Sequence, residues 1–311
     1  MTAPSQVIQP AKPIAAAPSR TPLWIGLSLL ATYVIWGSTY FAIRIGLESF
    51  PPFLMIGLRF TVAGSVLYAV LRWQGSPAPT RGQWGRAGIV GACLIGGGMA
   101  MSAFAGQYIA SALVALIVTT SPLWTALFAG LWGEWPSRQE WIGLVLGLIG
   151  TGLLSAGGDT SATLFGIVLV IAAAAAWGLG SAWSRQLDLP DGLMATAAQM
   201  LIGGVIVLAV SLVRGERLTA APTLGPLLAL VYLITFGSLI AFSAYNYLLK
   251  HVRPALAASN SYVNPVIALG LGVGFAGEQM PSTLWLALPL ILVGVGCVLL
   301  RKQAPAKDET A

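Results

Sequence analysis

The residues of this chain best suited to recognise a small molecule are aromatic and polar side chains inside long apolar runs. In the first run, side chains three or four positions apart share one helical face: Tyr33, Trp36, Tyr40 and Arg44. In a later run the same spacing joins Trp177, Ser181 and Ser184. Aromatic rings offer a ligand apolar and cation–π surfaces, and hydroxyl groups offer hydrogen bonds. A single residue of this kind is more often an interhelical contact or part of an interfacial belt, so the predicted site rests on the whole set.

Amide and phenol groups occur in two further runs. Asn260 and Asn264 fall inside an unusually polar stretch of a late apolar run, and Tyr245 lies in the run before it. An amide in hydrocarbon needs a hydrogen-bonding partner, so both asparagines are expected to face another helix or a wet cavity. Met101 is expected either to fill a gap in the core or to form part of a cavity wall. The predicted apolar and cation–π walls are Trp36, Tyr40, Met101, Trp177 and Tyr245.

Charge inside the apolar runs is sparse. Arg59 lies about two turns into the second run, and its guanidinium could bind a substrate carboxylate, or extend to the interface and pair with Glu48. Arg44 has Glu48 four residues further on, which favours a local ion pair at the outer boundary. All ten Asp and Glu residues fall in tails, loops or the ends of runs. A buried carboxylate relay for proton coupling is therefore not predicted.

Two prolines interrupt apolar runs at equivalent places. Pro122 and Pro265 lack the backbone N–H group and clash with the carbonyl four residues earlier, which frees the carbonyls of Val118 and Ser261. A broken backbone at membrane depth persists only where protein or a cavity satisfies it. These carbonyls could bind a substrate ammonium group, or the breaks could act as hinges during gating.

The elements that must position these residues are membrane-spanning helices. The chain of 311 residues is 57% hydrophobic and 8% charged, whereas soluble domains carry about 25% charged residues. Runs of about 20 apolar residues are long enough to cross the hydrocarbon core. The ten predicted spans are 23–45, 52–72, 87–106, 108–132, 140–157, 163–184, 192–213, 225–249, 254–276 and 283–300.

The basic residues predict the orientation. Cytoplasmic loops of membrane proteins are enriched in Lys and Arg. With the N-terminus inside, twelve of the 16 Lys and Arg residues fall on the cytoplasmic side, two fall outside and two lie within spans. Both termini are therefore expected in the cytoplasm, with residues 1–22 and 302–311 as cytoplasmic tails. The first tail is rich in Pro and Ala and is expected to be disordered.

The chain repeats itself. Ala112-Leu113 and Pro122 recur as Ala255-Leu256 and Pro265, and Trp36-Gly37 recurs as Trp177-Gly178. Gly133-Glu134, Trp141, Gly150 and Gly152 likewise recur about 144 positions later. The predicted fold is an all-α polytopic membrane protein of ten transmembrane helices, arranged as two inverted five-helix repeats at 23–157 and 163–301. Five crossings per repeat reverse the second repeat, which suits alternating access to a site near the midplane.

Other classes of protein fit the sequence poorly. Cys93 and Cys297 lie in apolar runs and are expected to behave as small hydrophobic residues, and His251 has no intramembrane acid to orient it. Neither a metal-ligand cluster nor a nucleophile–base pair is visible, so no cofactor, metal or enzymatic activity is predicted. Nucleic-acid binding is not expected either, because no basic cluster is interleaved with aromatic residues. A channel would be distinguished by steady conductance.

At this point the sequence resembles a known family. Ile35-Trp36-Gly37-Ser38-Thr39-Tyr40-Phe41, Arg59, Ser121-Pro122 and Tyr262-Val263-Asn264-Pro265 are similar to motifs of the EamA family in the drug/metabolite transporter superfamily. The resemblance covers about 23–301 and implies a bacterial inner-membrane exporter of amino acids or related metabolites. Small multidrug members of the superfamily use a membrane-buried Glu in their first helix, which this chain lacks. The expected substrates are neutral or aromatic amino acids, with drugs or other small metabolites as the alternative. The expected partners are the substrate and membrane lipid, and the protein is a monomer or a homodimer.

Overall fold

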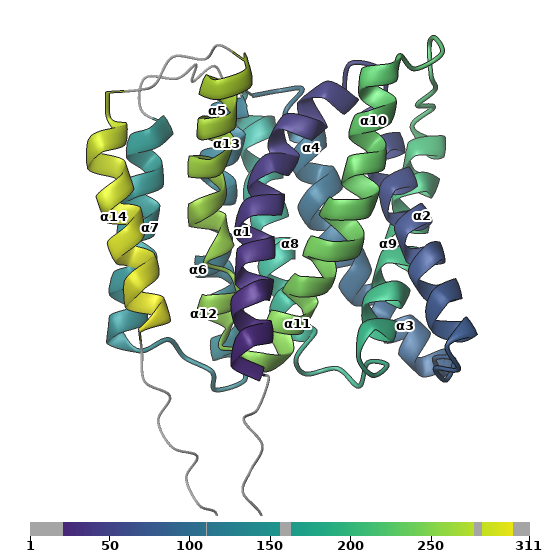
Figure 1. Cartoon of the computed structure of the whole chain (residues 1–311), viewed down its shortest axis with the longest axis horizontal. Helices are drawn as coiled ribbons and strands as arrows, with labels where there is room; N and C mark the ends of the chain where they lie inside the picture. The colour runs from purple at the N-terminus through teal and green to yellow at the C-terminus, as the bar shows by residue number, and fades with distance from the viewer. Residues whose placement is uncertain (1–20, 110, 156–162, 277–281, 301–311) are drawn as a thin grey trace, which may run out of the picture.

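The computed structural model describes residues 21–109, 111–155, 163–276 and 282–300, and this part of the chain is all helical. Apart from residues 21 and 22, the two predicted tails lie outside the described residues, as does the repeated Gly277-Glu278 pair. The helices stand roughly side by side, and the start of helix α1 (Thr21–Gly46) and the end of helix α14 (Leu284–Leu299) lie at the same end of the bundle (Figure 1). This end is called the termini end below.

The first half of the chain forms eight helical segments. They are α1 (Thr21–Gly46), α2 (Pro52–Trp73), α3 (Arg81–Gly91), the π-helix η1 (Ala92–Ala100), α4 (Met101–Ala105), α5 (Ser111–Val118), α6 (Ser121–Gly130) and α7 (Arg138–Ser155). Segments α3, η1 and α4 follow one another without a break and correspond to the third predicted span. Segments α5 and α6 correspond to the fourth.

The second half follows the same order. Its segments are α8 (Leu164–Trp183), α9 (Leu193–Val213), α10 (Leu224–Tyr232), the π-helix η2 (Leu233–Phe242), α11 (Ser243–His251), α12 (Pro254–Ala257), α13 (Asn260–Ala276) and α14 (Leu284–Leu299). The π-helical turns, which often mark functional sites, therefore occur in the corresponding segment of both halves.

Glycines show how the two halves pack. A Cβ on Gly64 of α2 would meet the backbone of Leu201 at 2.4 Å, and a Cβ on Gly204 of α9 would meet the backbone of Thr61 at 2.4 Å. These contacts are reciprocal at an offset of 140 residues. Because each helix lacks a side chain where the other crosses it, α2 and α9 can approach closely.

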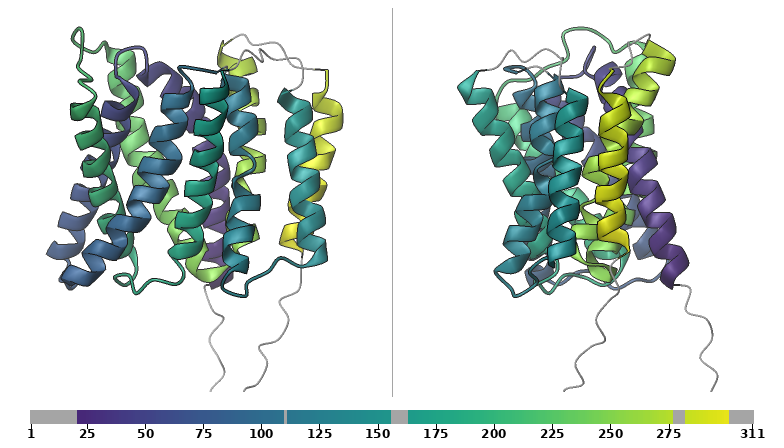
Figure 2. Two further views of the ribbon diagram at one scale, coloured as in Figure 1. Left: turned by 180° about the vertical axis from the view of Figure 1, so that it is seen from behind. Right: turned by 90° about the vertical axis from the view of Figure 1, so that its left-hand side faces the viewer.

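The same reciprocity holds elsewhere in the bundle. Gly37 of α1 faces Ile267 of α13, and Gly178 of α8 faces Trp124 of α6. Helices α7 and α14 form a pair at one edge of the bundle (Figure 2), and Gly150 and Gly294 each fit against the other helix of that pair.

The glycines of α7 and α13 differ in what they contact. Gly143, Gly147 and Gly150 of α7 lie closely against α13 and α14. A Cβ on Gly270 or Gly274 of α13 would meet nothing within 4 Å among the described residues. The face of α13 that carries these two glycines therefore points away from the described part of the bundle.

Eight described helices are long and apolar enough to cross a membrane, and the shorter apolar helix α14 was found in addition. Helix α7 occupies the fifth predicted span. Large apolar side chains also cover the exterior: Trp73 is 89% exposed, Leu164 78% and Trp285 76%. Soluble monomers rarely expose such continuous apolar surfaces, so the exterior suits a lipid environment.

Most helix ends agree closely with the predicted spans, but the third begins earlier than expected. The prediction started it at residue 87, whereas α3 begins at Arg81. The Oγ1 atom of Thr80 accepts a hydrogen bond from the backbone N–H of Gln83, and the Gln83 side chain accepts one from the backbone N–H of Thr80. This capping box satisfies two helix-end donors and extends the helix into a polar stretch.

Candidate functional site

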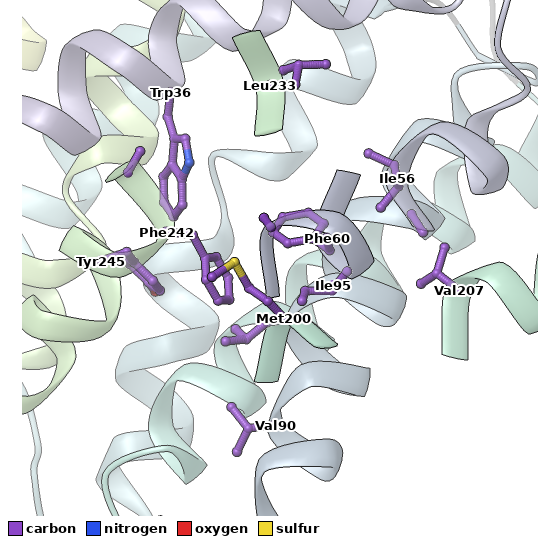
Figure 3. Packing of buried hydrophobic residues seen from close by; sticks show 14 of the residues in the cluster. Trp36, Ile56, Phe60, Val90, Ile95, Met200, Val207, Leu233, Phe242 and Tyr245 are labelled. Atoms are coloured by element: carbon purple, nitrogen blue, oxygen red, sulfur yellow. The ribbon is translucent and has the colours of Figure 1, made fainter. Parts of the chain in front are cut away.

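Three aromatic rings meet inside the bundle. Trp36 comes from α1, Trp177 from α8 and Tyr245 from α11. The centroids of the Trp36 and Trp177 rings are 5.6 Å apart, and the Tyr245 ring lies 5.1 Å from Trp36 and 5.2 Å from Trp177. Figure 3 shows Trp36 and Tyr245 beside the buried side chains around them. These three residues, which come from helices far apart in the sequence, are called the aromatic cluster below.

Hydrogen bonds fix the cluster. The Trp177 Nε1–H group donates to the Tyr245 hydroxyl at 3.0 Å, and the Ser181 hydroxyl lies 2.7 Å from the same oxygen. The Trp36 Nε1–H group donates to the Gly237 carbonyl of η2 at 3.0 Å. Every polar group of the three rings therefore has a partner, as buried polar groups require.

Arg59 lies deep in the bundle, with only 1% of its surface exposed. Its Nε–H group donates to the Ser238 hydroxyl of η2 at 2.7 Å, and its guanidinium lies 4.8 Å from the centroid of the Phe60 ring. Its Nη2 atom has no hydrogen-bond partner among the described residues. The alternative prediction, that Arg59 extends to the interface and pairs with Glu48, is therefore wrong.

The two asparagines of α13 have different surroundings. Turned so that its NH2 group faces the nearby carbonyls, the Asn264 side chain donates to Thr32, Tyr33 and Asn260 at 3.0–3.2 Å. These hydrogen bonds join α13 to α1. Asn264 therefore faces another helix, as expected. The Oδ1 atom of Asn260 is buried and has no partner among the described residues.

Both proline sites contain a helix break, but the break precedes the proline. Pro122 lies in the first turn of α6, and Pro265 lies inside α13, whose break from α12 occurs at Ala258-Ser259. The Val118 carbonyl accepts a hydrogen bond from the Ser121 hydroxyl at 2.6 Å. The expectation that this carbonyl is free was therefore wrong, because the side chain next to the proline supplies the missing donor.

Two predicted wall residues lie beside the cluster rather than within it. Tyr40 is one turn beyond Trp36 in α1 and is 39% exposed. Met101 is partly exposed at the start of α4, three residues after Gly98. A Cβ on Gly98 would stand 2.8 Å from the Trp177 ring, so η1 packs directly on that indole.

A hollow of about 350 Å³ lies at the termini end of the aromatic cluster. Ser184 and Leu249, which line it, follow Ser181 and Tyr245 by about one helical turn. The rest of its lining is mostly charged or polar and includes Glu134, Arg185, Asp188 and Lys250. The hollow therefore lies about one helical turn from the aromatic cluster, and none of the three cluster rings lines it.

Ion pairs join the loops at the termini end. Arg185 pairs with Glu134 at 2.8 Å, and its Nη1 atom also donates to the carbonyls of Leu249 and Val252. Arg253 pairs at 2.8 Å with Glu140, which is 1% exposed. These contacts tie the segment between α6 and α7 to the ends of α8 and α11.

The opposite end of the bundle is closed differently. Glu216, in the segment between α9 and α10, accepts hydrogen bonds from the backbone N–H groups of Phe53 and Leu54 at the start of α2. The Arg214 guanidinium lies 5.5 Å from the Phe53 ring and 4.2 Å from the Phe104 ring. A carboxylate at a helix N-terminus and stacked cations are both stabilising.

Three further residues of the bundle were not among the predicted site residues. Gly237 and Ser238 contact Trp36 and Arg59, and Gln199 is 1% exposed with its Oε1 atom lacking a described partner. Gln199 could have been found, because an amide in a run of apolar residues is as unusual as Asn260. Gly237 and Ser238 carry no such sequence signal. Among the described residues, no group of three or more His, Cys, Asp or Glu could hold a metal ion.

The sequence and the fold of this chain are similar to those of known proteins. The model of the EamA-like transporter family matches residues 23–156 and again residues 164–300. The uncharacterized inner membrane transporter YedA of Escherichia coli is 43% identical over 286 residues, which cover 91% of this chain and 94% of YedA. Protein PecM of Dickeya dadantii is 28% identical and covers 83% of this chain and 88% of PecM. A solved crystal structure with 24% identity has a similar fold, with a TM-score of 0.76 over 89% of this chain and 96% of that one.

Proposed function

This chain belongs to the EamA-like transporter family, and we propose that it exports neutral or aromatic amino acids, or related metabolites, across the bacterial inner membrane by alternating access. Its relation to an inner-membrane transporter over nearly the full length of both chains supports the location. The observation that carries the proposal is the aromatic cluster, in which Trp36 and Trp177 occupy equivalent places in the two halves and their rings meet.

Two inverted repeats explain why equivalent residues meet. The family model matches the chain twice, and glycine contacts between α2 and α9 are reciprocal. If α7 and α14 also cross the membrane, each half has five spans, and the second half enters from the opposite side. Equivalent residues near the pseudo-twofold axis then lie at the midplane, where transporters of this architecture bind their substrates.

The orientation of the chain follows from the same arrangement. An even number of spans places both termini on one side, and the start of α1 and the end of α14 do lie at one end (Figure 1). Arg86, Arg185 and Arg253 form ion pairs at this end. An excess of Arg favours the cytoplasmic side, so the hollow of about 350 Å³ would be the cytoplasmic entrance.

In the proposed cycle, a substrate enters this hollow and displaces the aromatic cluster from its closed packing. The ring faces of Trp36, Trp177 and Tyr245 then hold its apolar part, with Tyr40 and Met101 at the margin and Asn260 as a polar contact. The helix breaks next to Pro122 and Pro265 would act as the hinges that let α6 and α13 bend. Release outward requires the contacts of Glu216 and Arg214 to separate.

The test is flux through the purified protein in liposomes, using radiolabelled amino acids with and without a pH gradient. Saturable flux that competing amino acids reduce, at a rate independent of the gradient, is the expected result. Faster flux with the gradient would mean that a proton site exists outside the groups discussed above. If only drugs or other metabolites show flux, those compounds rather than amino acids are the substrates. Steady conductance would indicate a channel.

A further inference from the structure

Arg59 and Glu140 are the charged side chains that are buried in the described part of the bundle, and Glu140 is paired with Arg253. A charge at membrane depth is costly unless it is paired. The ion pairs found among the described residues, such as those of Arg86, Arg185 and Arg253, do not include Arg59. Ser238 and the Phe60 ring contact Arg59, but neither carries a negative charge.

The fold itself does not require a charge at this position. The reciprocal contacts of Gly64 and Gly204 align α2 with α9 at an offset of 140 residues, which makes Gln199 the equivalent of Arg59. Gln199 is buried to the same extent as Arg59, with 1% of its surface exposed, yet it is neutral. The second half therefore packs an uncharged side chain where the first half places a cation.

The guanidinium lies next to the aromatic cluster. Gly237 accepts the hydrogen bond of the Trp36 indole, and a Cβ on Gly237 would stand 2.6 Å from Nη2 of Arg59. The absence of a side chain at Gly237 thus makes room for the unpartnered end of Arg59 beside Trp36. A cationic fork and an indole face are placed so that one small molecule could contact both.

We propose that Arg59 recognises the carboxylate of the transported molecule, so that substrates are amino acids or organic acids whose apolar part packs against Trp36. Arginine binds carboxylates through two parallel charge-assisted hydrogen bonds. The site is closed in this structure, so binding requires the opening that the transport cycle supplies. This inference rests on the proposed function and narrows its substrate class.

The experiment compares ligands that share a phenyl group and either carry or lack a carboxylate. The purified protein is titrated with phenylalanine, 3-phenylpropionate, phenylalaninamide and phenethylamine, and binding is measured by calorimetry and by the shift in Tm. Leucine and leucinamide form a second, aliphatic pair. The expected result is binding of the carboxylates and at least tenfold weaker binding of the amides and the amine.

Arg59→Gln is the informative variant, because it places in the first half the residue that the second half already buries at the equivalent position. Loss of the charged contact should weaken carboxylate binding about 10- to 100-fold while the Tm without ligand stays close to that of the wild type. Arg72→Gln on the same helix removes an exposed charge and is the matched control. If Arg59→Gln does not fold, Arg59→Lys and Ser238→Ala test the same contact.

The outcomes separate this inference from the proposed function. Equal binding of acids and amides, no binding of any carboxylate, or wild-type affinity in Arg59→Gln would overturn the role of Arg59. Flux of uncharged compounds together with these results would leave a transporter with a different substrate class. Absence of flux for every compound, with carboxylates still bound, would overturn the transport function but not the carboxylate site.

Discussion

The two halves of the molecule share their packing and differ in their polar groups. The glycines that bring helices together occur at equivalent places, as in Gly64 with Gly204 and Gly37 with Gly178. The buried charge does not match, because Arg59 in the first half corresponds to Gln199 in the second. Duplication therefore accounts for the scaffold and for the equivalent Trp36 and Trp177, whereas the charge at the candidate site depends on a position where the halves diverge.

The largest expected loss of stability comes from substitutions at the equivalent glycines where helices pack closely. A Cβ on Gly178 would meet the backbone nitrogen of Thr125 at 2.7 Å, whereas a Cβ on Gly37 would meet the side chain of Ile267 at 2.6 Å. Backbone yields less readily than a side chain, so Gly178→Ala should lower the free energy of unfolding by about 3 kcal/mol and Gly37→Ala by about 2 kcal/mol. Thermal unfolding in detergent measures both. A smaller loss for Gly178→Ala than for Gly37→Ala would contradict the account.

A smaller loss of stability is expected at Gly237, which lies beside Arg59, the position where the two halves diverge. Gly237→Ala places a Cβ within 2.6 Å of Nη2 of Arg59, and the flexible guanidinium should move aside. Because the positive charge then leaves its place beside Trp36, affinity for carboxylates should fall about tenfold, while stability falls by only about 1 kcal/mol. Gly96→Ala is the matched control in η1, where the nearest atom to the added Cβ is 3.8 Å away. Equal effects of both variants on carboxylate affinity would refute this prediction.

The smallest effect concerns the hydroxyl of the aromatic cluster. Tyr245→Phe keeps the ring but removes the acceptor of the Trp177 indole N–H, leaving that partly buried donor unsatisfied. The expected loss of stability is about 1 kcal/mol. Thermal unfolding of Tyr245→Phe, with Tyr68→Phe as a control on α2, measures it. Equal stability of the two variants would mean that the hydrogen bond makes no net contribution to the free energy of unfolding.

Much of the scaffold could be predicted from sequence, because apolar runs and repeated glycines record the helices and their contacts directly. The convergence of Trp36, Trp177 and Tyr245 was also predictable, since aromatic residues at helical spacing recur in spans that must share one bundle.

Other features depend on contacts between segments far apart in the chain and could not be predicted. The hydrogen bond from Arg59 to Ser238 spans 179 positions, and no local pattern selects Ser238 over its neighbours. One local contact could not be predicted either: the Val118 carbonyl accepts the Ser121 hydroxyl because of the rotamer that Ser121 adopts, and the position of Pro122 alone does not determine that rotamer. The early start of α3 at Arg81, in contrast, was readable from the Thr80 and Gln83 pair.

The central claim is that both halves supply the wall of one transport site. Its most direct test is the rate of saturable amino-acid flux in liposomes for Trp36→Ala and Trp177→Ala, with Trp73→Ala as a control because Trp73 is 89% exposed. We expect each cluster variant to lose more than about tenfold in kcat/KM, a loss equivalent to about 1.4 kcal/mol, while the control is unchanged. Wild-type flux in either cluster variant, with the protein folded, would contradict the central claim.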